Sequence, residues 1–79
     1  MNISEKYKIV FKEFGLHIKE LREKRNISIE KLSDETGIKK EYLKKIENGN
    51  AYGVKINKHI FKIAKALKIS FSEIFDFKY

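Results

Sequence analysis

The chain has 79 residues, which is enough for one domain built around a single small hydrophobic core. It contains no cysteine, which excludes a disulfide framework and a thiolate metal site, and 42% of its residues are hydrophobic, which excludes a disordered basic tail. The net charge is +7, and residues 38–79 contribute +6 of it, with ten Lys and Arg against four Asp and Glu. This localised charge indicates a polyanionic partner, and the alternative is a merely soluble, lysine-rich protein.

The first predicted helix runs from about Tyr7 or Phe11 to Arg25. Apolar side chains recur there at steps of three and four residues, which places them on one face of the helix. The preceding residues, 1–10, are interpreted as an N-terminal lead without the apolar run of a signal peptide. Asn26 follows the helix, and because asparagine tolerates the left-handed conformation, we expect it to end the helix.

A second helix is expected from Ile29 to about Thr36, with Ser28 as its N-cap. Gly37 supplies the positive φ that a tight turn requires, and a third helix follows from about Lys39 to Glu47. Asn48-Gly49 is expected to stop this third helix. Small Ser33 would let the two helices approach closely, and four apolar residues would hold the pair to the core: Leu32, Ile38, Leu43 and Ile46.

The helical pattern lapses from Asn50 to Ile56 and then returns. Asn57 is predicted to cap a fourth helix, from Lys58 to Leu67, and Ser70 a short fifth one, from Phe71 to Phe75. The inner face of the fourth helix is expected to hold Ile60, Phe61, Ile63, Ala64 and Leu67. Residues 76–79 form a short aromatic tail. No period of two argues for a strand, so the predicted fold class is all-α, a compact bundle of five helices.

The second helix, the glycine turn and the third helix make a predicted helix-turn-helix. Two short helices that cross steeply through such a turn let the second one project into a DNA major groove, which is about 12 Å wide. The third helix carries four lysines, whose ammonium groups can donate to guanine or to phosphate. This combination predicts binding to double-stranded DNA.

Three stretches resemble the Cro/cI-type (XRE) helix-turn-helix regulators of bacteria and phages: FGLHIKELREKRNIS, EKLSDETGIKKEYLKKIENG and IFKIAKALKISFSEIF. The resemblance implies a lambda-repressor-like DNA-binding domain over residues 11–75. It also implies a transcriptional regulator, expected to be a repressor, that binds an inverted-repeat operator as a homodimer. Such a protein would be bacterial or phage-encoded and would act in the cytoplasm, at the nucleoid.

The resemblance further implies roles for individual residues. Five match positions that face bases in relatives: Lys39, Lys40, Glu41, Lys44 and Lys45. Five are expected to meet phosphates: Ser28, Tyr42, Asn48, Lys55 and Lys58. Glu41 would either accept a hydrogen bond from the N4 amino group of a cytosine or point away from the bases and contact a neighbouring lysine. Tyr42 would either meet DNA or pack against the second helix.

Two further groups of residues have expected structural roles. Arg22 and Glu47 match positions that the family often pairs, and a partly buried, bidentate pair would fix the angle of the third helix. The alternative for them is two solvated surface charges. The C-terminal aromatic surface exceeds what a small monomer easily covers, which predicts a dimer interface at Phe71, Phe75, Phe77 and Tyr79. Closure of the domain's own core is the alternative, expected more for Phe71 and Phe75 than for the other two.

The sequence departs from the family pattern in three places. Ile29 stands where many members carry a glutamine that contacts DNA, so that contact is expected to be missing. The segment from Asn50 to Ile56 is about two residues longer than usual and lacks the common proline. Asn26 replaces a frequent glycine, which is a mild change.

Other functions find less support. His17 and His59 lie 42 positions apart without acidic or cysteine partners at ligand spacing, so neither a metal site nor an enzyme is predicted. We expect no cofactor and no small-molecule ligand in so small a core, and no membrane-spanning segment. Insertion into an anionic membrane would need an apolar face that the third helix lacks. The main alternative is a protein-interaction module, such as an antitoxin or anti-activator, although protein interfaces are depleted in lysine.

Overall fold

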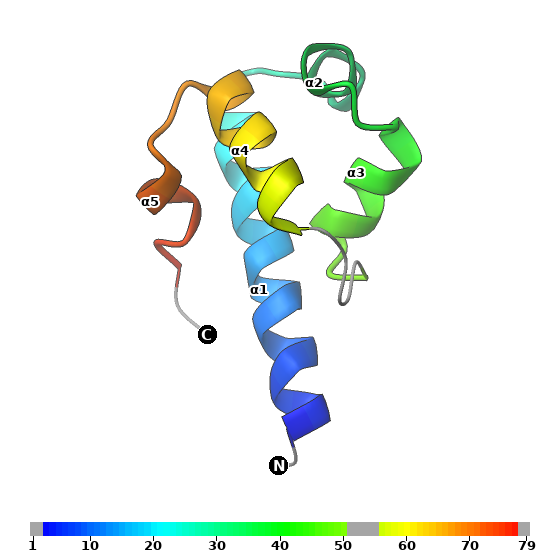
Figure 1. The fold of residues 1–79 in the computed structure, drawn as a ribbon, viewed down its shortest axis with the longest axis vertical. Coiled ribbons are helices and arrows are strands. Elements are labelled where there is room, and N and C mark those ends of the chain that lie inside the picture. The colour runs from blue at the N-terminus through cyan, green and yellow to red at the C-terminus, as the bar shows by residue number, and fades with distance from the viewer. Residues whose placement is uncertain (1–2, 51–55, 78–79) are drawn as a thin grey trace.

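The computed structural model describes residues 3–50 and 56–77, and these residues form five α-helices and no strand (Figure 1). The helices are α1 (Ile3–Lys24), α2 (Ile29–Thr36), α3 (Lys40–Glu47), α4 (Ile56–Leu67) and α5 (Phe71–Ile74). Helix α1 contacts α3 and α5, α2 contacts α3 and α4, and α4 contacts α5. The all-α fold class predicted from the sequence is confirmed. No helix in the described part of the chain is both long and apolar enough to span a bilayer.

Two helix starts differ from the prediction. Helix α1 begins at Ile3, so residues 3–10 are helical rather than a lead, and its N-terminal end projects beyond the other helices (Figure 1). The sequence has no proline or glycine before Gly15 to interrupt the helix, and Glu5 in its first turn suits the helix dipole. Helix α4 begins at Ile56, which places Asn57 inside the helix instead of at its N-cap.

The ends of the helices follow local backbone chemistry. Asn26 adopts a φ of 55°, and the N–H of Ile27 donates to the carbonyl of Arg22 at 3.2 Å, which is the Schellman pattern that closes a helix. The prediction that Asn26 ends α1 is therefore confirmed. Helix α4 ends in the same way at Lys68, whose φ is 58° and which the sequence analysis did not identify.

The core forms where the apolar faces of all five helices meet. Eleven buried residues compose it: Phe14, Ile18, Leu32, Ile38, Leu43, Ile46, Ile60, Ile63, Ala64, Leu67 and Ile74. The prediction was wrong for Phe61, whose side chain is 61% exposed. The buried residues of α4 follow steps of three and four from Ile60, and Phe61 falls just outside that face, so its ring stacks on Phe71 of α5 instead, with 4.3 Å between the ring centroids.

Candidate nucleic-acid interface

The turn between α2 and α3 is held by hydroxyl groups as well as by glycine. Gly37 has a φ of 74°, as predicted, and its N–H donates to the carbonyl of Ser33 at 2.8 Å. The Ser33 hydroxyl donates to the carbonyl of Ile38 at 2.6 Å, and the buried Thr36 hydroxyl donates to the carbonyl of Leu32 at 2.7 Å. The Thr36 oxygen also accepts from the N–H of Ile38 at 3.1 Å.

These contacts add a residue that the sequence analysis missed. Thr36 lies directly before the turn glycine, where its side chain satisfies backbone groups that a helix end leaves open. The only local signal for this role was a short hydroxyl residue next to Gly37. Ser33 was expected only to be small, and its hydrogen bond to Ile38 fixes the exit of the turn directly.

Helix α3 crosses α1 at very close range, at Gly15. A Cβ atom added to Gly15 would clash with the carbonyl oxygen of Ile46 and would lie 2.9 Å from that of Glu47. Only a glycine lets the last turn of α3 approach the α1 backbone this closely. The contact sets the distance between the two helices.

An ion pair between α1 and the last turn of α3 lies beside this crossing. The Nε of Arg22 donates to Oε2 of Glu47 at 2.7 Å, and its Nη2 donates to Oε1 at 3.0 Å, which is a bidentate arrangement. The two side chains are 12% and 6% exposed, so the structure places them together as a largely buried pair. A third bond runs from Arg22 Nη1 to the carbonyl of Ile27 at 2.8 Å. Hydrogen bonding to Glu47 raises the pKa of the Arg22 guanidinium.

With its inner side fixed in this way, α3 presents a basic outer side. The five residues expected to face bases lie on the surface, four of them exposed and Lys40 half-buried: Lys39, Lys40, Glu41, Lys44 and Lys45. Their contacts with bases stay predictions.

The first turn of α3 carries charges that disfavour the helix. Lys39 is the N-cap residue but makes no side-chain capping bond, and Lys40 follows it. Cations at a helix N-terminus oppose the helix dipole, and a missing cap leaves N–H groups open. Glu41 is the acidic residue of this turn and offsets part of that cost. The arrangement leaves positive charge where α3 points outward.

The side chain of Tyr42 is half-buried and packs against α4. Its ring lies 5.0 Å from the ring of His59 on α4, centroid to centroid, and its hydroxyl is buried without a hydrogen-bond partner among the described residues. Burial raises the pKa of the Tyr42 phenol. The ring contact is thus with α4 rather than with the second helix, where the sequence placed the packing alternative, and a DNA contact of Tyr42 stays a prediction.

Three of the other expected phosphate contacts are exposed. Ser28 is exposed and caps α2, where its Oγ accepts from the N–H of Lys31 at 3.0 Å. Asn48 is exposed at the end of α3, and Lys58 is exposed in the first turn of α4. Lys55 lies outside the described residues.

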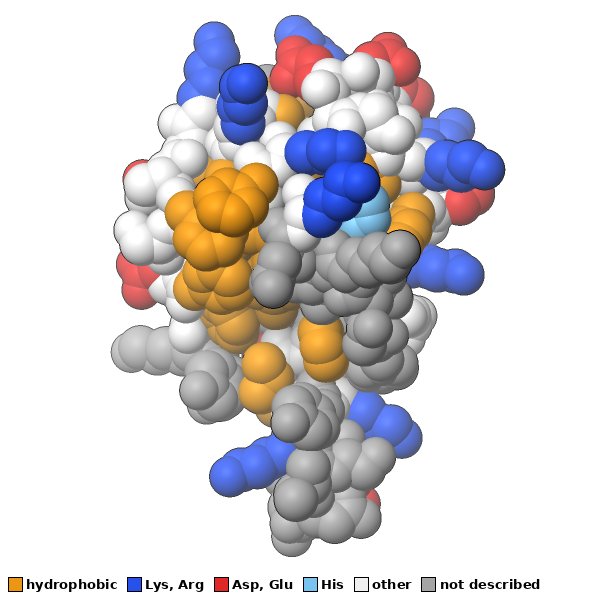
Figure 2. Space-filling view, viewed as in Figure 1, with side chains coloured by type: hydrophobic (Ala, Val, Ile, Leu, Met, Phe, Trp, Pro, Cys, Tyr) orange, Lys and Arg blue, Asp and Glu red, His pale blue; other side chains and the backbone are white. Residues whose placement is uncertain are grey.

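The aromatic residues near the C-terminus differ in whether they are exposed or packed on the core. Phe71 and Phe75 are 38% and 46% exposed, and with Phe61 they form the aromatic patch, which Figure 2 shows as a hydrophobic area over α4 and α5. Phe77 instead is half-buried, with its ring centroid 5.7 Å from that of Phe14. The ring of Phe75 also stacks on that of Phe14, with 5.7 Å between the centroids, as expected of a residue that helps to close the core. Phe77 contributes to this packing more than the sequence indicated, because the chain after α5 folds back onto α1. Tyr79 lies outside the described residues.

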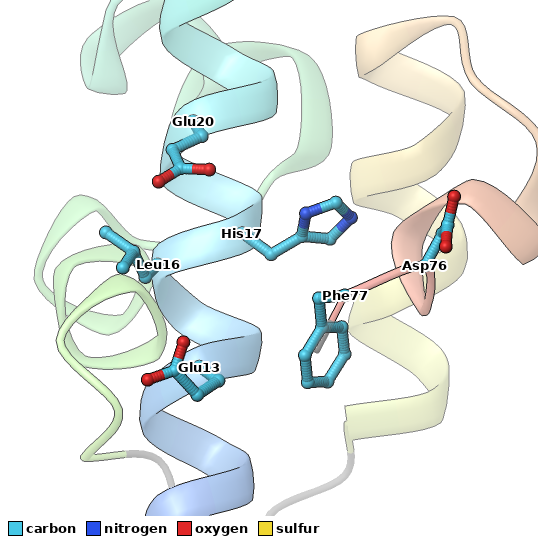
Figure 3. A pocket seen from close by; sticks show the side chains of 6 residues that line it. All are labelled: Glu13, Leu16, His17, Glu20, Asp76 and Phe77. Atoms are coloured by element: carbon cyan, nitrogen blue, oxygen red, sulfur yellow. The ribbon is translucent and has the colours of Figure 1, made fainter. Parts of the chain in front are cut away.

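The face of α1 that is turned toward the chain after α5 is acidic. A shallow pocket of about 330 Å³ lies between α1 and the chain after α5, and Figure 3 shows its lining side chains: Glu13, Leu16, His17, Glu20, Asp76 and Phe77. The Nε2–H of His17 donates to the carbonyl of Glu73 at 2.8 Å, which ties α1 to α5. Three carboxylates repel phosphate, so this face is unsuited to DNA. No group of residues in the described chain is arranged to hold a metal ion.

Comparison with known proteins agrees with this architecture. The crystal structure of the restriction-modification controller protein C.AhdI from Aeromonas hydrophila matches with a TM-score of 0.74 and 30% sequence identity, over 81% of this chain and 94% of that one. A search of curated proteins gave no match. The family model described as Helix-turn-helix matches residues 18–74, more than half of the chain and including α2, the turn and α3. The resemblance seen in the sequence is thus confirmed, and the chain belongs to the XRE-type family of helix-turn-helix DNA-binding transcription regulators.

Proposed function

We propose that this regulator is a sequence-specific repressor that binds an inverted-repeat operator as a homodimer, with α3 in the major groove. The observation that carries the proposal is the asymmetry of α3. Its inner side is fixed by Gly15 and by the bidentate pair of Arg22 and Glu47, while its outer side presents only charged residues. A rigidly held helix with a basic outer side suits recognition of base edges between two phosphate backbones.

The proposed DNA-contacting residues have two roles: some recognise bases, and others bind phosphates. Lys40 lies at the start of α3, where a side chain reaches base edges, and a good base contact contributes about 1–3 kcal/mol of discrimination. Lys58 at the start of α4 and Asn48 at the end of α3 flank the helix, which suits contacts with phosphates. Repression follows when the bound domain occupies a promoter. The likeness to C.AhdI makes restriction-modification genes the first class of target to examine.

The test is a selection of bound duplexes from a random pool near physiological salt, with Lys40→Ala and Lys58→Ala in parallel. We expect an inverted repeat to be enriched. Lys40→Ala should relax one base position in each half-site, whereas Lys58→Ala should weaken all sequences alike and lower the salt slope of binding by about two, one for each protomer. Lys6→Ala is the control, because it removes an exposed lysine at the far end of α1. If no sequence is enriched and binding disappears with salt, the lysines provide only nonspecific attraction, and a protein partner becomes the better hypothesis.

For the homodimer, we propose the aromatic patch of Phe61, Phe71 and Phe75 as the interface. Phe61 is the most exposed of the large hydrophobic residues described, and its ring stacks on that of Phe71 with 4.3 Å between the centroids. Rigid, clustered aromatic residues are typical of the centres of protein interfaces. We therefore add Phe61 to the proposed interface and leave out Phe77, whose ring packs on that of Phe14.

Phe61→Lys is expected to give a folded monomer. An aromatic residue at an interface centre contributes about 2 kcal/mol or more, so the dimer dissociation constant should rise about 30-fold or more. Sedimentation equilibrium measures this change, and circular dichroism checks the fold. The matched control is Leu16→Lys. Leu16 is another exposed apolar residue, 44% exposed, and it lies on α1, away from the aromatic patch. An unchanged dimer in Phe61→Lys would place the interface elsewhere.

A further inference from the structure

One face of α1 combines lysines with the contacts to α3. Lys12, Gly15, Lys19 and Arg22 follow one another at steps of three, four and three residues, so they share a single face of the helix. Gly15 touches the backbone of the last turn of α3, and Arg22 pairs with Glu47. Lys12 and Lys19 occupy the positions on either side of Gly15, and both are exposed.

Lys12 lies directly beside the end of α3. A Cβ atom added to Gly49, the residue after the α3 C-cap, would lie 2.6 Å from the Cα of Lys12. The backbone at Asn48 and Gly49 therefore rests on α1 at this residue. The Lys12 side chain thus begins beside Gly49, which directly follows Asn48, one of the expected phosphate contacts.

The charges around this face leave it positive. Glu47, the acidic residue nearest to Gly15 on α3, is already neutralised by Arg22. Glu23 lies four residues after Lys19 and can pair with it, but such an exposed pair contributes little and gives way to a phosphate. The carboxylates of Glu13 and Glu20 lie on another face of α1, around the pocket of Figure 3. Helix α1 is thus polarised, with lysines on the side of α3.

We propose that Lys12 and Lys19 bind phosphates of the same DNA that α3 reads, so that the DNA-binding surface continues from the end of α3 onto α1. Seven residues of helix span about 10.5 Å, which lets the two lysines reach different phosphates. Lys12 lies outside residues 18–74, the range that the family model matches, whereas Lys19 lies inside it. The inference rests on the proposed function and adds a phosphate-binding element to it.

The experiment compares two double variants of the full chain on the selected operator duplex. One combines Lys12→Ala with Lys19→Ala, and the control combines Lys6→Ala with Lys24→Ala, which removes two exposed lysines from a different face of the same helix. Dissociation constants are measured between 50 and 200 mM salt. Each lost phosphate contact lowers the salt slope by about 0.9, and a homodimer carrying the double variant loses four such contacts, so the advantage of the parent over the first variant should shrink about 150-fold across this range. The control should keep the parental slope.

The single variant Lys40→Ala, measured on the same duplex, separates this inference from the proposed function. If both double variants share the parental slope while Lys40→Ala still relaxes its base position, α1 does not touch DNA and the inference is overturned alone. If Lys40→Ala also leaves binding unchanged, α3 does not read the groove, and the proposed function fails together with the inference. Circular dichroism of all variants shows whether a change in affinity reflects loss of folding.

Discussion

Gly15→Ala is expected to destabilise the protein by about 2 kcal/mol. The added methyl group would clash with the backbone carbonyl of Ile46, and backbone cannot rotate away as a side chain can. Overpacking costs about 1–3 kcal/mol, and a rigid backbone neighbour puts this case at the upper end, less about 1 kcal/mol for the better helix propensity of alanine. A single core of this size provides about 3–5 kcal/mol in total, so roughly half of the stability would be lost.

Urea unfolding followed by circular dichroism measures the effect, and the midpoint should fall by about 2 M if the slope is about 1 kcal/mol per M. Gly37→Ala is the comparison, because no atom lies within 4 Å of its added Cβ and only the φ of 74° opposes it. That variant should lose about 1–2 kcal/mol from backbone strain alone and should keep the α1–α3 crossing. A Gly15→Ala protein with the parental midpoint would show that α3 can move off α1 at little cost, against the close contact described above.

Arg22→Ala is expected to have the larger effect, about 3 kcal/mol or more, which approaches complete unfolding. The substitution leaves the Glu47 carboxylate, 6% exposed, without its cation, and it removes the donor that the carbonyl of Ile27 uses. Breaking one side of a buried pair costs about 3–5 kcal/mol, because the remaining charge stays desolvated. Arg22→Lys should recover only part of this loss, since an ammonium group cannot form the two parallel bonds.

The control that identifies the cause is the pair of substitutions Arg22→Met and Glu47→Met in one chain. Replacing both charges by apolar side chains of similar length is often neutral, so this variant should unfold at a urea concentration near the parental one. A double-mutant cycle then gives the coupling energy between the two residues. Should the double variant be as unstable as Arg22→Ala, the loss would come from packing and from Ile27 rather than from an uncompensated charge.

The parts of the fold that the sequence predicted well are those with local signals at both ends. Helix α2 has the predicted bounds because Ser28 caps it and Gly37 ends it within eight residues. Where such signals are weak, the bounds shifted. Helix α1 extends to Ile3 because nothing interrupts it, and Asn57 lies inside α4 because asparagine is also tolerated within a helix.

The exposure of the aromatic residues could not be predicted from sequence patterns. Phe61 and Phe77 are both apolar, yet one is exposed and the other packs on Phe14. Which of them is covered depends on how α5 and the chain after it return to α1. That path is set by contacts such as the bond between His17 and the carbonyl of Glu73, 56 residues apart, which no short-range pattern encodes.

By itself, the sequence determined the helical class, the turn at Gly37, the excess of basic charge on α3 and the family, because these depend on residues within a few turns of one another or on motif order. The tertiary structure alone decided the exposure of Phe61, the close crossing at Gly15, and the choice between a buried pair and two solvated charges for Arg22 and Glu47. The physical reason is that periodicity and capping set which face of a helix is apolar, whereas distances between helices are set only when all five faces are packed together.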